Sequence, residues 1–287
     1  MQKSYTPYTV LKKAAKKDLR GDETTRALAT VIKESLEFLV GCSKTDLESL
    51  VPGKKYFAFS RSSKISRPVV ESLWDAKLSE SKIAGFVSGN YAGLEASTLD
   101  KLLYTMAMSF CCATDVQKQG DKKTPATFFE SFIGNIFARE LGANPRKQVE
   151  VLNLDMAATL PTDFLFDAGS RKCRIHLPVK LSTRERVVQV WAHQRVLDGV
   201  YGFGRFRGIL VVGTETLVSK ETHKVTEICL PDQWSVYQMF ISQLWRVYYL
   251  DMPVRYEQLP KVFPYIQVKP LSAFFGEKAK LMLPAAE

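Results

Sequence analysis

The sequence lacks the features that mark secreted, zinc-binding and membrane proteins. Its five cysteines are an odd number with no paired CxxC spacing, so neither a disulfide framework nor a zinc cluster is indicated. The start, Met1-Gln-Lys-Ser-Tyr, has no apolar core of a signal peptide, and no uninterrupted apolar run is long enough to span a bilayer. We therefore expect a cytoplasmic protein without membrane association.

The composition is strongly basic, with 40 lysine and arginine residues against 30 aspartate and glutamate residues. The 287 residues carry a formal net charge of +10 at pH 7, which attracts a polyanion over about 8 Å at physiological salt. Nucleic acid is the commonest such partner, although a basic enzyme without a polyanionic substrate can have the same composition. Because 46% of the residues are hydrophobic, the chain can bury a large core and still carry a helical appendage.

Hydrophobic periodicity divides the chain into a helical first part, residues 1–115, and a second part, residues 116–287, where strands and helices alternate. Helical spacing predicts helices over residues 7–41, 69–78, 98–112, 124–142, 183–197 and 233–250. Short apolar segments predict strands over residues 149–154, 163–167, 174–181, 208–212 and 225–230. The expected architecture is α/β, with a central mixed β-sheet flanked by helices and an N-terminal helical region.

Two of the predicted strands end in side chains that can act on a phosphodiester. Asp163 lies at one end of the apolar strand Phe164-Leu-Phe, and Lys180 ends the next strand, His176-Leu-Pro-Val-Lys. Neighbouring strands would place the carboxylate and the ammonium group on one edge of the sheet, where they could share a phosphate and a divalent cation. Such residues can also be no more than solvated strand ends.

The triplet Arg184-Glu185-Arg186 follows this lysine closely. Two guanidinium groups match O6 and N7 of guanine, and a carboxylate accepts from the amino group of cytosine, so the triplet describes neighbouring C:G pairs. In the first turn of the 183–197 helix these side chains would reach base edges in a major groove. The competing interpretation is a hydrated surface cluster, worth about 1 kcal/mol or less.

Glu130 is a third candidate residue. It shares a largely apolar face of the 124–142 helix with Gly134, Phe137 and Leu141. A carboxylate is costly to bury there unless it is paired or bound to a cation. Glu130 therefore either forms a salt bridge at the rim of the core or binds a metal ion.

The combination of Asp163, Lys180-x-x-x-Arg-Glu-Arg and a preceding helical glutamate resembles a known family. It looks like the type II restriction endonucleases of the PD-(D/E)xK superfamily that read CC and GG half-sites, the EcoRII/SsoII-like group. The resemblance covers about residues 124–213. It implies a restriction-endonuclease-like core in which Asp163 and Glu130 bind the metal ion, Mg²⁺, and Lys180 is the catalytic lysine.

The resemblance also implies how the target is read. Arg184 and Arg186 would contact the two guanines of one strand, and Glu185 would accept from the paired cytosines. Gln119, in the loop before the Glu130 helix, resembles by its spacing a family residue that contacts the C:G pair from a second direction.

The sequence departs from the family pattern at the remaining acid. Pro178 stands two residues before the lysine, where the general motif has a carboxylate. This group places its last acid on the following helix, and the expected glutamate falls at His193 or Gln194. Either side chain could bind the metal ion as a neutral ligand in place of the glutamate. The protein would then bind its metal ion more weakly than the family does, or it would be a descendant of the family that has lost its activity.

Residues of the first part add contacts of lower specificity. Tyr56, Phe57 and Phe59 either stack on an extruded base or belong to the core. Candidate phosphate contacts, which would be blind to sequence and sensitive to salt, are Arg61, Lys64, Lys118, Lys122 and Lys123.

These residues lead to the prediction of a magnesium-dependent type II restriction endonuclease that cleaves double-stranded DNA at a short palindrome with CC/GG halves. Residues 1–115 would contribute to DNA binding, and residues 116–287 would form the nuclease core with a C-terminal helix. Cleavage of both strands of a palindrome predicts a homodimer, with the aromatic-rich 233–250 helix either at the interface or in the core. Two alternatives stay open: a repair or recombination nuclease of the same fold, and a sequence-specific DNA-binding protein that does not cleave.

Overall fold

The computed structural model describes residues 6–153, 156–167, 169, 173–183, 187–281 and 283. The chain forms two compact units. The first consists of Met1–Asn135 and Glu215–Ile228, and the second of Ile136–Thr214 and Cys229–Glu287. The functional division expected at residue 115 stays a prediction. Among the described residues, no helix has both the length and the apolar character needed to cross a membrane.

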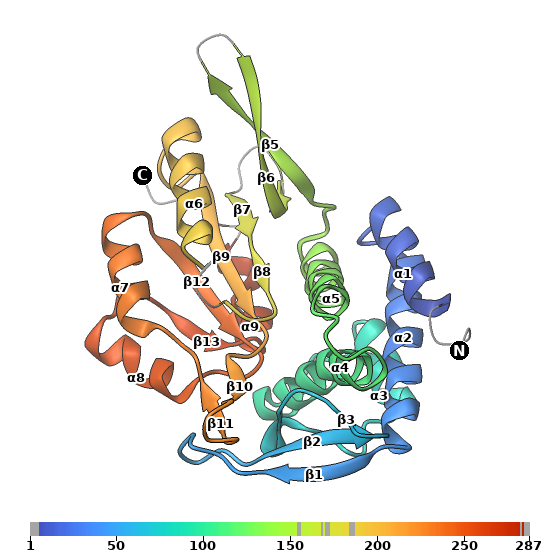
Figure 1. Ribbon diagram of the computed structural model, residues 1–287. Helices are drawn as coiled ribbons and strands as arrows, with labels where there is room; N and C mark the ends of the chain where they lie inside the picture. Colours follow the sequence, from blue (N-terminus) through green and yellow to red (C-terminus); the bar gives the residue numbers. More distant parts are fainter. Residues whose placement is uncertain are drawn as a thin grey trace. The chain divides into compact units, whose positions relative to one another are not determined.

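The first unit is built around one long helix, α4 (Ala96–Gln117), which packs against α2 (Asp22–Val40) and the small sheet of this unit (Figure 1). Every residue of α4 from Leu102 to Cys112 is buried, as expected for a helix at the centre of a unit rather than on its surface. The remaining helices are α1 (Thr6–Lys17), η1 (Glu71–Leu73), α3 (Glu80–Val87) and the first part of α5 (Lys123–Leu141). The strands are β1 (Ser43–Leu47), β2 (Tyr56–Arg61), β3 (Lys64–Ile65), β4 (Val69–Val70), β10 (Thr216–Val218) and β11 (Val225–Glu227).

Residues 43–78 differ from the helical segment expected from the sequence. β1, β3 and β4 each pair with β2 in an antiparallel sheet. Ser62 and Ser63 have positive φ angles of 49° and 60° and close the tight β2–β3 hairpin, a conformation usually taken by Asn-Gly or Gly-Gly. The helix expected at residues 69–78 was wrong because a short apolar run fits both the helical and the strand period, whereas the helix expected at 98–112 is confirmed as α4.

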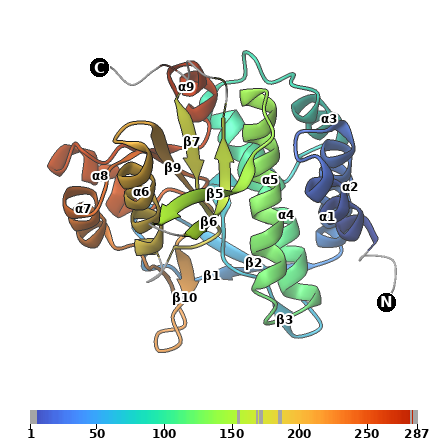
Figure 2. The ribbon, with the colours of Figure 1, turned by 90° about the horizontal axis from the view of Figure 1, so that it is seen from above.

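The second unit contains a seven-stranded mixed sheet (Figures 1 and 2). Its order is β13-β12-β9-β7-β6-β5, with β8 pairing with β9 beyond the end of β7. The β5–β6 and β6–β7 pairs are antiparallel, and the others are parallel. The strands are β5 (Arg146–Asn153), β6 (Met156–Phe166), β7 (Arg174–Leu177), β8 (Val179–Lys180), β9 (Phe206–Val212), β12 (Leu244–Tyr249) and β13 (Val268–Pro270).

Helices cover both faces of this sheet, which explains why its central strands are almost continuously apolar. On one face lie α6 (Val188–Tyr201), α7 (Pro231–Phe240) and α8 (Val254–Val262) (Figure 2). Val247 and Tyr249 of β12 pack with them. Tyr248, which points to the other face, contacts Phe274 of α9 (Ala273–Leu281) with ring centroids 6.0 Å apart. The expected α/β fold with a central mixed sheet is confirmed.

The single helix expected at residues 233–250 was wrong. This segment forms α7, a short connection and β12. Trp234, Tyr248 and Tyr249 are fully buried in the second unit, so these aromatic residues belong to the core and do not form the dimer surface considered above. The period was misjudged because a strand buried on both faces carries no polar side to distinguish it from a buried helix.

Candidate active site

A bulge in β6 places Asp163. On β5, one residue separates Arg146 from Gln148, whereas their partners on β6, Leu165 and Pro161, are separated by three residues, 162 to 164. The two extra residues disrupt the ladder at Asp163 and turn the local side chains, as bulges commonly do beside functional sites.

Lys180 comes to the same place through the break between β7 and β8. Pro178 separates the two short strands and has no N–H to contribute to a sheet. Lys180 Nζ donates to Asp163 Oδ2 over 2.7 Å, and the backbone N–H of Val179 donates to the same oxygen over 2.8 Å. The structure therefore brings the predicted carboxylate and lysine together, with both side chains partly exposed.

The pair lines a pocket of about 160 Å³. His193, one of the two residues predicted to replace the missing acid, also lines it. Burial, and secondarily the positive charge of Lys180, lower the pKa of His193. Its imidazole is therefore held toward the neutral form. The complete lining is Pro161, Thr162, Asp163, His176, Pro178, Lys180, Gln189, Val190 and His193.

Gln194, the other predicted replacement, is buried and fully engaged in hydrogen bonds. Its Nε2 donates to Asp198 Oδ1 and to the carbonyl of Phe206, both over 3.0 Å. Its Oε1 lies 3.0 Å from His176 Nδ1. A direct role of Gln194 as a ligand stays a prediction, but these contacts favour an indirect one, in which it holds His176.

His176 is the pocket residue that the sequence analysis missed. Its ring is 1% exposed, and burial lowers its pKa to about 4 despite the opposing hydrogen bond with Gln194. The signal in the sequence was a histidine between the apolar residues Ile175 and Leu177, four residues before the lysine.

The other predicted residues fall into two groups. Arg184, Glu185 and Arg186 lie outside the described residues, so their reading of bases stays a prediction. The remaining candidates belong to the first unit, and their functional roles also stay predictions. Glu130 is partly buried on α5, Lys118 and Gln119 are exposed between α4 and α5, Arg61 is exposed at the end of β2, and Lys64 donates to the carbonyl of Gln117.

Burial shows which role the aromatic residues of β2 have. Tyr56, Phe57 and Phe59 are 3%, 6% and 2% exposed, and the rings of Phe57 and Phe59 form edge contacts with Trp74. They are core residues, and the alternative in which they stack on an extruded base was wrong.

The atoms of the pocket are suited to a divalent cation. Asp163 Oδ1 accepts no hydrogen bond from the residues that the structure describes, so one carboxylate oxygen can bind a cation. Mg²⁺ commonly binds through one or two carboxylates and keeps several waters. Within the described ranges, no three side chains among His, Cys, Asp and Glu are grouped to share an ion. The cation would therefore be held by few protein ligands, with water completing its shell.

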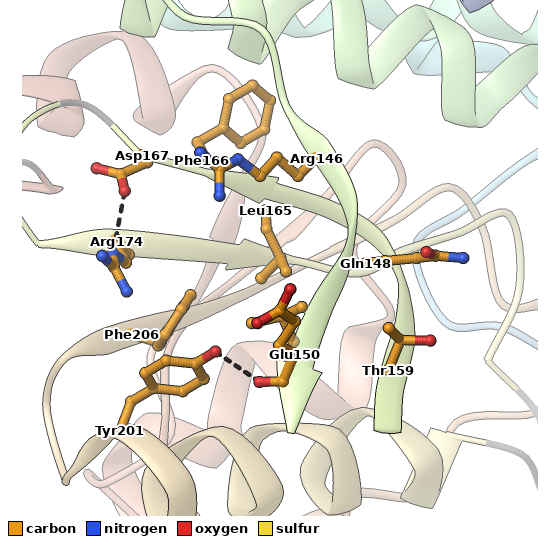
Figure 3. A pocket seen from close by; sticks show the side chains of 11 residues that line it. Arg146, Gln148, Glu150, Thr159, Leu165, Phe166, Asp167, Arg174, Tyr201 and Phe206 are labelled. Atoms are coloured by element: carbon orange, nitrogen blue, oxygen red, sulfur yellow. Dashed lines mark hydrogen bonds and ion pairs between the residues drawn. The ribbon is translucent and has the colours of Figure 1, made fainter. Parts of the chain in front are cut away.

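A second pocket, of about 380 Å³, lies at the other end of β6, β7 and α6 (Figure 3). Its wall contains the Arg174–Asp167 salt bridge of 3.1 Å and Tyr201, whose hydroxyl donates to the carbonyl of Glu150. Arg174 also lies 5.6 Å from the ring centroid of Phe206. None of the site residues predicted from the sequence lines this pocket, although it is larger.

Comparison with solved structures identifies the fold. The type IIP restriction endonuclease Kpn2I superposes with a TM-score of 0.78 at 25% sequence identity, and the match covers 98% of this chain and 97% of Kpn2I. This is the fold of a type II restriction endonuclease. A match to the restriction endonuclease PspGI in complex with substrate DNA has a TM-score of 0.43 at 11% identity, covers 98% of this chain and 95% of PspGI, and is too weak to inform the site. No protein-family model and no curated protein sequence matches this chain.

The likeness to Kpn2I extends over 98% of this chain. It supports a site-specific nuclease that binds DNA.

Proposed function

We propose that this protein is a type II restriction endonuclease that hydrolyses double-stranded DNA at a short palindrome with CC/GG half-sites. The observation that carries the proposal is the contact of 2.7 Å between Lys180 and Asp163, at a β-bulge lining a pocket, in a chain similar to Kpn2I over 98% of its length. Side chains that were only solvated would have no reason to converge on one partly buried carboxylate oxygen.

The residues of the pocket divide the chemistry between them. A divalent cation such as Mg²⁺, bound at Asp163, would polarise the scissile phosphate and lower the pKa of a bound water. Lys180 lies where its ammonium group can stabilise negative charge developing on the phosphoryl oxygens. Asp163 Oδ2 accepts from Lys180 Nζ and from the N–H of Val179, so the carboxylate is held by the backbone and in turn holds this lysine in position. His193, whose lowered pKa favours the neutral form, can accept or donate a hydrogen bond without adding charge.

Recognition is assigned to the segment between β8 and α6. The backbone N–H groups of Gly213 and Thr214 donate to the carbonyls of Lys180 and Leu181, each over 2.9 Å, so the start of this segment is anchored next to the catalytic pair. Arg184 and Arg186 follow within a few residues, and guanidinium forks are the commonest readers of guanine. A palindromic target would be read and cut by a homodimer, one active site for each strand.

Plasmid cleavage tests this function against its two alternatives. Supercoiled plasmid is incubated with the protein and Mg²⁺, and the products are sequenced at their ends. Discrete fragments whose ends share CC/GG halves support the proposal. A smear indicates a repair or recombination nuclease, and a gel shift without cutting indicates a DNA-binding protein. Asp163→Asn is the matched control, because it keeps the size of the side chain and removes its charge.

A further inference from the structure

Two buried polar atoms of the Asp163 pocket have no partner among the described residues. They are Nε2 of His176 and Oγ1 of Thr162, and both residues line the pocket. A buried polar atom without a hydrogen bond is uncommon and points to a water or an ion at that position. The pocket therefore contains a nitrogen and a hydroxyl whose partner is not part of the described chain.

The hydrogen bonds of Gln194 determine which nitrogen of His176 carries the proton. Both donors of the Gln194 amide are used, by Asp198 Oδ1 and the carbonyl of Phe206, so the atom facing His176 Nδ1 is the amide oxygen, an acceptor. Nδ1 must then donate, and the neutral ring carries its lone pair on Nε2. The ring is fixed in the orientation and tautomer that metal-binding histidines commonly have, with the distal N–H held by an oxygen.

The sheet leaves room for this arrangement at one glycine. Gly208 of β9 pairs with His176 of β7, and a Cβ atom built on Gly208 would lie 2.6 Å from Gln194 Oε1. Any other residue at this position would push the amide away from its contact with His176. Asp198, which accepts from Gln194, also accepts from the hydroxyl of Ser242, so the network is held from a second side.

We propose that His176, through Nε2, is a nitrogen ligand of the divalent cation bound at Asp163, and that it compensates for the carboxylate that Pro178 cannot supply. The proposal rests on the metal-dependent cleavage proposed above and adds a ligand to it. One carboxylate and one neutral imidazole favour ions that accept nitrogen, such as Mn²⁺ and Co²⁺, more than an all-oxygen site does. Gln194 is then a positioning residue, which holds the ligand and does not touch the cation.

Histidine spectroscopy tests this inference directly, because the chain has three histidines: His176, His193 and His223. Ring ¹⁵N spectra of the wild-type protein should show His176 as a neutral ring with the proton on Nδ1. Titration with Zn²⁺ as a diamagnetic probe should shift Nε2 of His176 and leave the exposed ring of His223, in the turn between β10 and β11, unchanged. A proton on Nε2, or an Nε2 signal that stays fixed while Asp163-dependent Zn²⁺ binding saturates, would overturn the proposal.

Mn²⁺ binding gives a second, independent measurement. Electron spin-echo spectra of the Mn²⁺-loaded protein should contain modulation from a coordinated histidine nitrogen, which His176→Leu removes and His223→Asn retains. In calorimetry, Gln194→Leu should weaken Mn²⁺ binding by about 10- to 100-fold, the usual effect of losing a residue that orients a ligand, and His176→Leu by at least as much. Retention of the modulation in folded His176→Leu would exclude His176 as the ligand.

The two proposals can fail separately. If the wild-type protein cuts DNA at discrete sites with a divalent cation but the ¹⁵N signal of His176 Nε2 does not change on metal binding, the proposed function is supported and the assignment of His176 as a ligand is wrong. If the Nε2 signal shifts and Mn²⁺ binds but no DNA is cut, the assignment of His176 as a ligand is supported and the proposed restriction activity is wrong.

Discussion

Replacement of Gly208 by alanine measures how tightly β9 approaches the Gln194–His176 pair. The added Cβ would lie 2.6 Å from Gln194 Oε1 and 2.7 Å from Leu244 Cδ2, both closer than atoms in contact allow. Gly208 is not among the glycines with positive φ, so the substitution introduces no backbone strain and its effect comes from this contact. Overpacking of a core costs about 1–3 kcal/mol, and loss of one hydrogen bond of Gln194 adds about 1 kcal/mol.

We therefore expect Gly208→Ala to lower the free energy of unfolding by about 2–4 kcal/mol, measured by urea denaturation. Gly199→Ala is the matched control, because Gly199 lies within α6 and a Cβ there meets nothing within 4 Å. Alanine in a helix should stabilise by about 0.5–1 kcal/mol relative to glycine. If Gly208→Ala unfolds at the wild-type urea concentration, β9 does not constrain the amide and the reasoning about Gln194 is wrong.

Three further predictions concern catalysis, recognition and pH. Lys180→Met should reduce single-turnover cleavage by about 10²- to 10³-fold and affect DNA binding much less; a variant that binds poorly but cuts bound DNA at the wild-type rate would contradict its role. Arg186→Ala should cost about 1–3 kcal/mol of binding to the cognate duplex and little to random DNA, and equal losses in gel-shift titrations would make it a phosphate contact. Because the pKa of buried His176 is lowered to about 4, the unfolded chain takes up a proton below about pH 6.5 while the folded protein does not. Stability should thus fall between pH 6.5 and 4, by at most about 3 kcal/mol relative to His176→Leu; parallel pH profiles of the two proteins would refute this.

The meeting of Asp163 and Lys180 could be predicted from the sequence, because each of these charged residues adjoins an apolar run in one of two neighbouring strands. The expectation that Asp163 ends its strand was wrong, because β6 runs from Met156 to Phe166 and Asp163 lies within it. The bulge that turns Asp163 could not be predicted, since two extra residues on β6 are visible only against the register of β5. His176 was missed for a related reason. A single buried histidine in a strand is as compatible with a satisfied core position as with a site, and the difference lies in Gln194 and Gly208, which are distant in sequence.

The error over residues 233–250 has a different physical origin. Hydrophobic periodicity identifies an element by the contrast between its apolar and polar sides. Tyr248 and Tyr249 point to opposite faces of β12, and both faces are covered by helices, so the contrast is absent and aromatic residues spaced along the segment also fit a helix.

Residues 215–228 belong to the first unit although they follow residues 136–214 of the second unit in the chain. This order affects how the protein folds during synthesis and how it can be engineered. β11 contacts the rest of the first unit through the bridge of Val225 with Ser49 and the salt bridge of Glu227 with Lys54, yet it leaves the ribosome only after most of the sheet of the second unit. The amino-terminal half must wait for these contacts, so it cannot complete its native structure early during translation. Exchange of amino-terminal segments between related enzymes would transfer only part of the first unit. A chimaera with a complete first unit would also need residues 215–228 from the same enzyme.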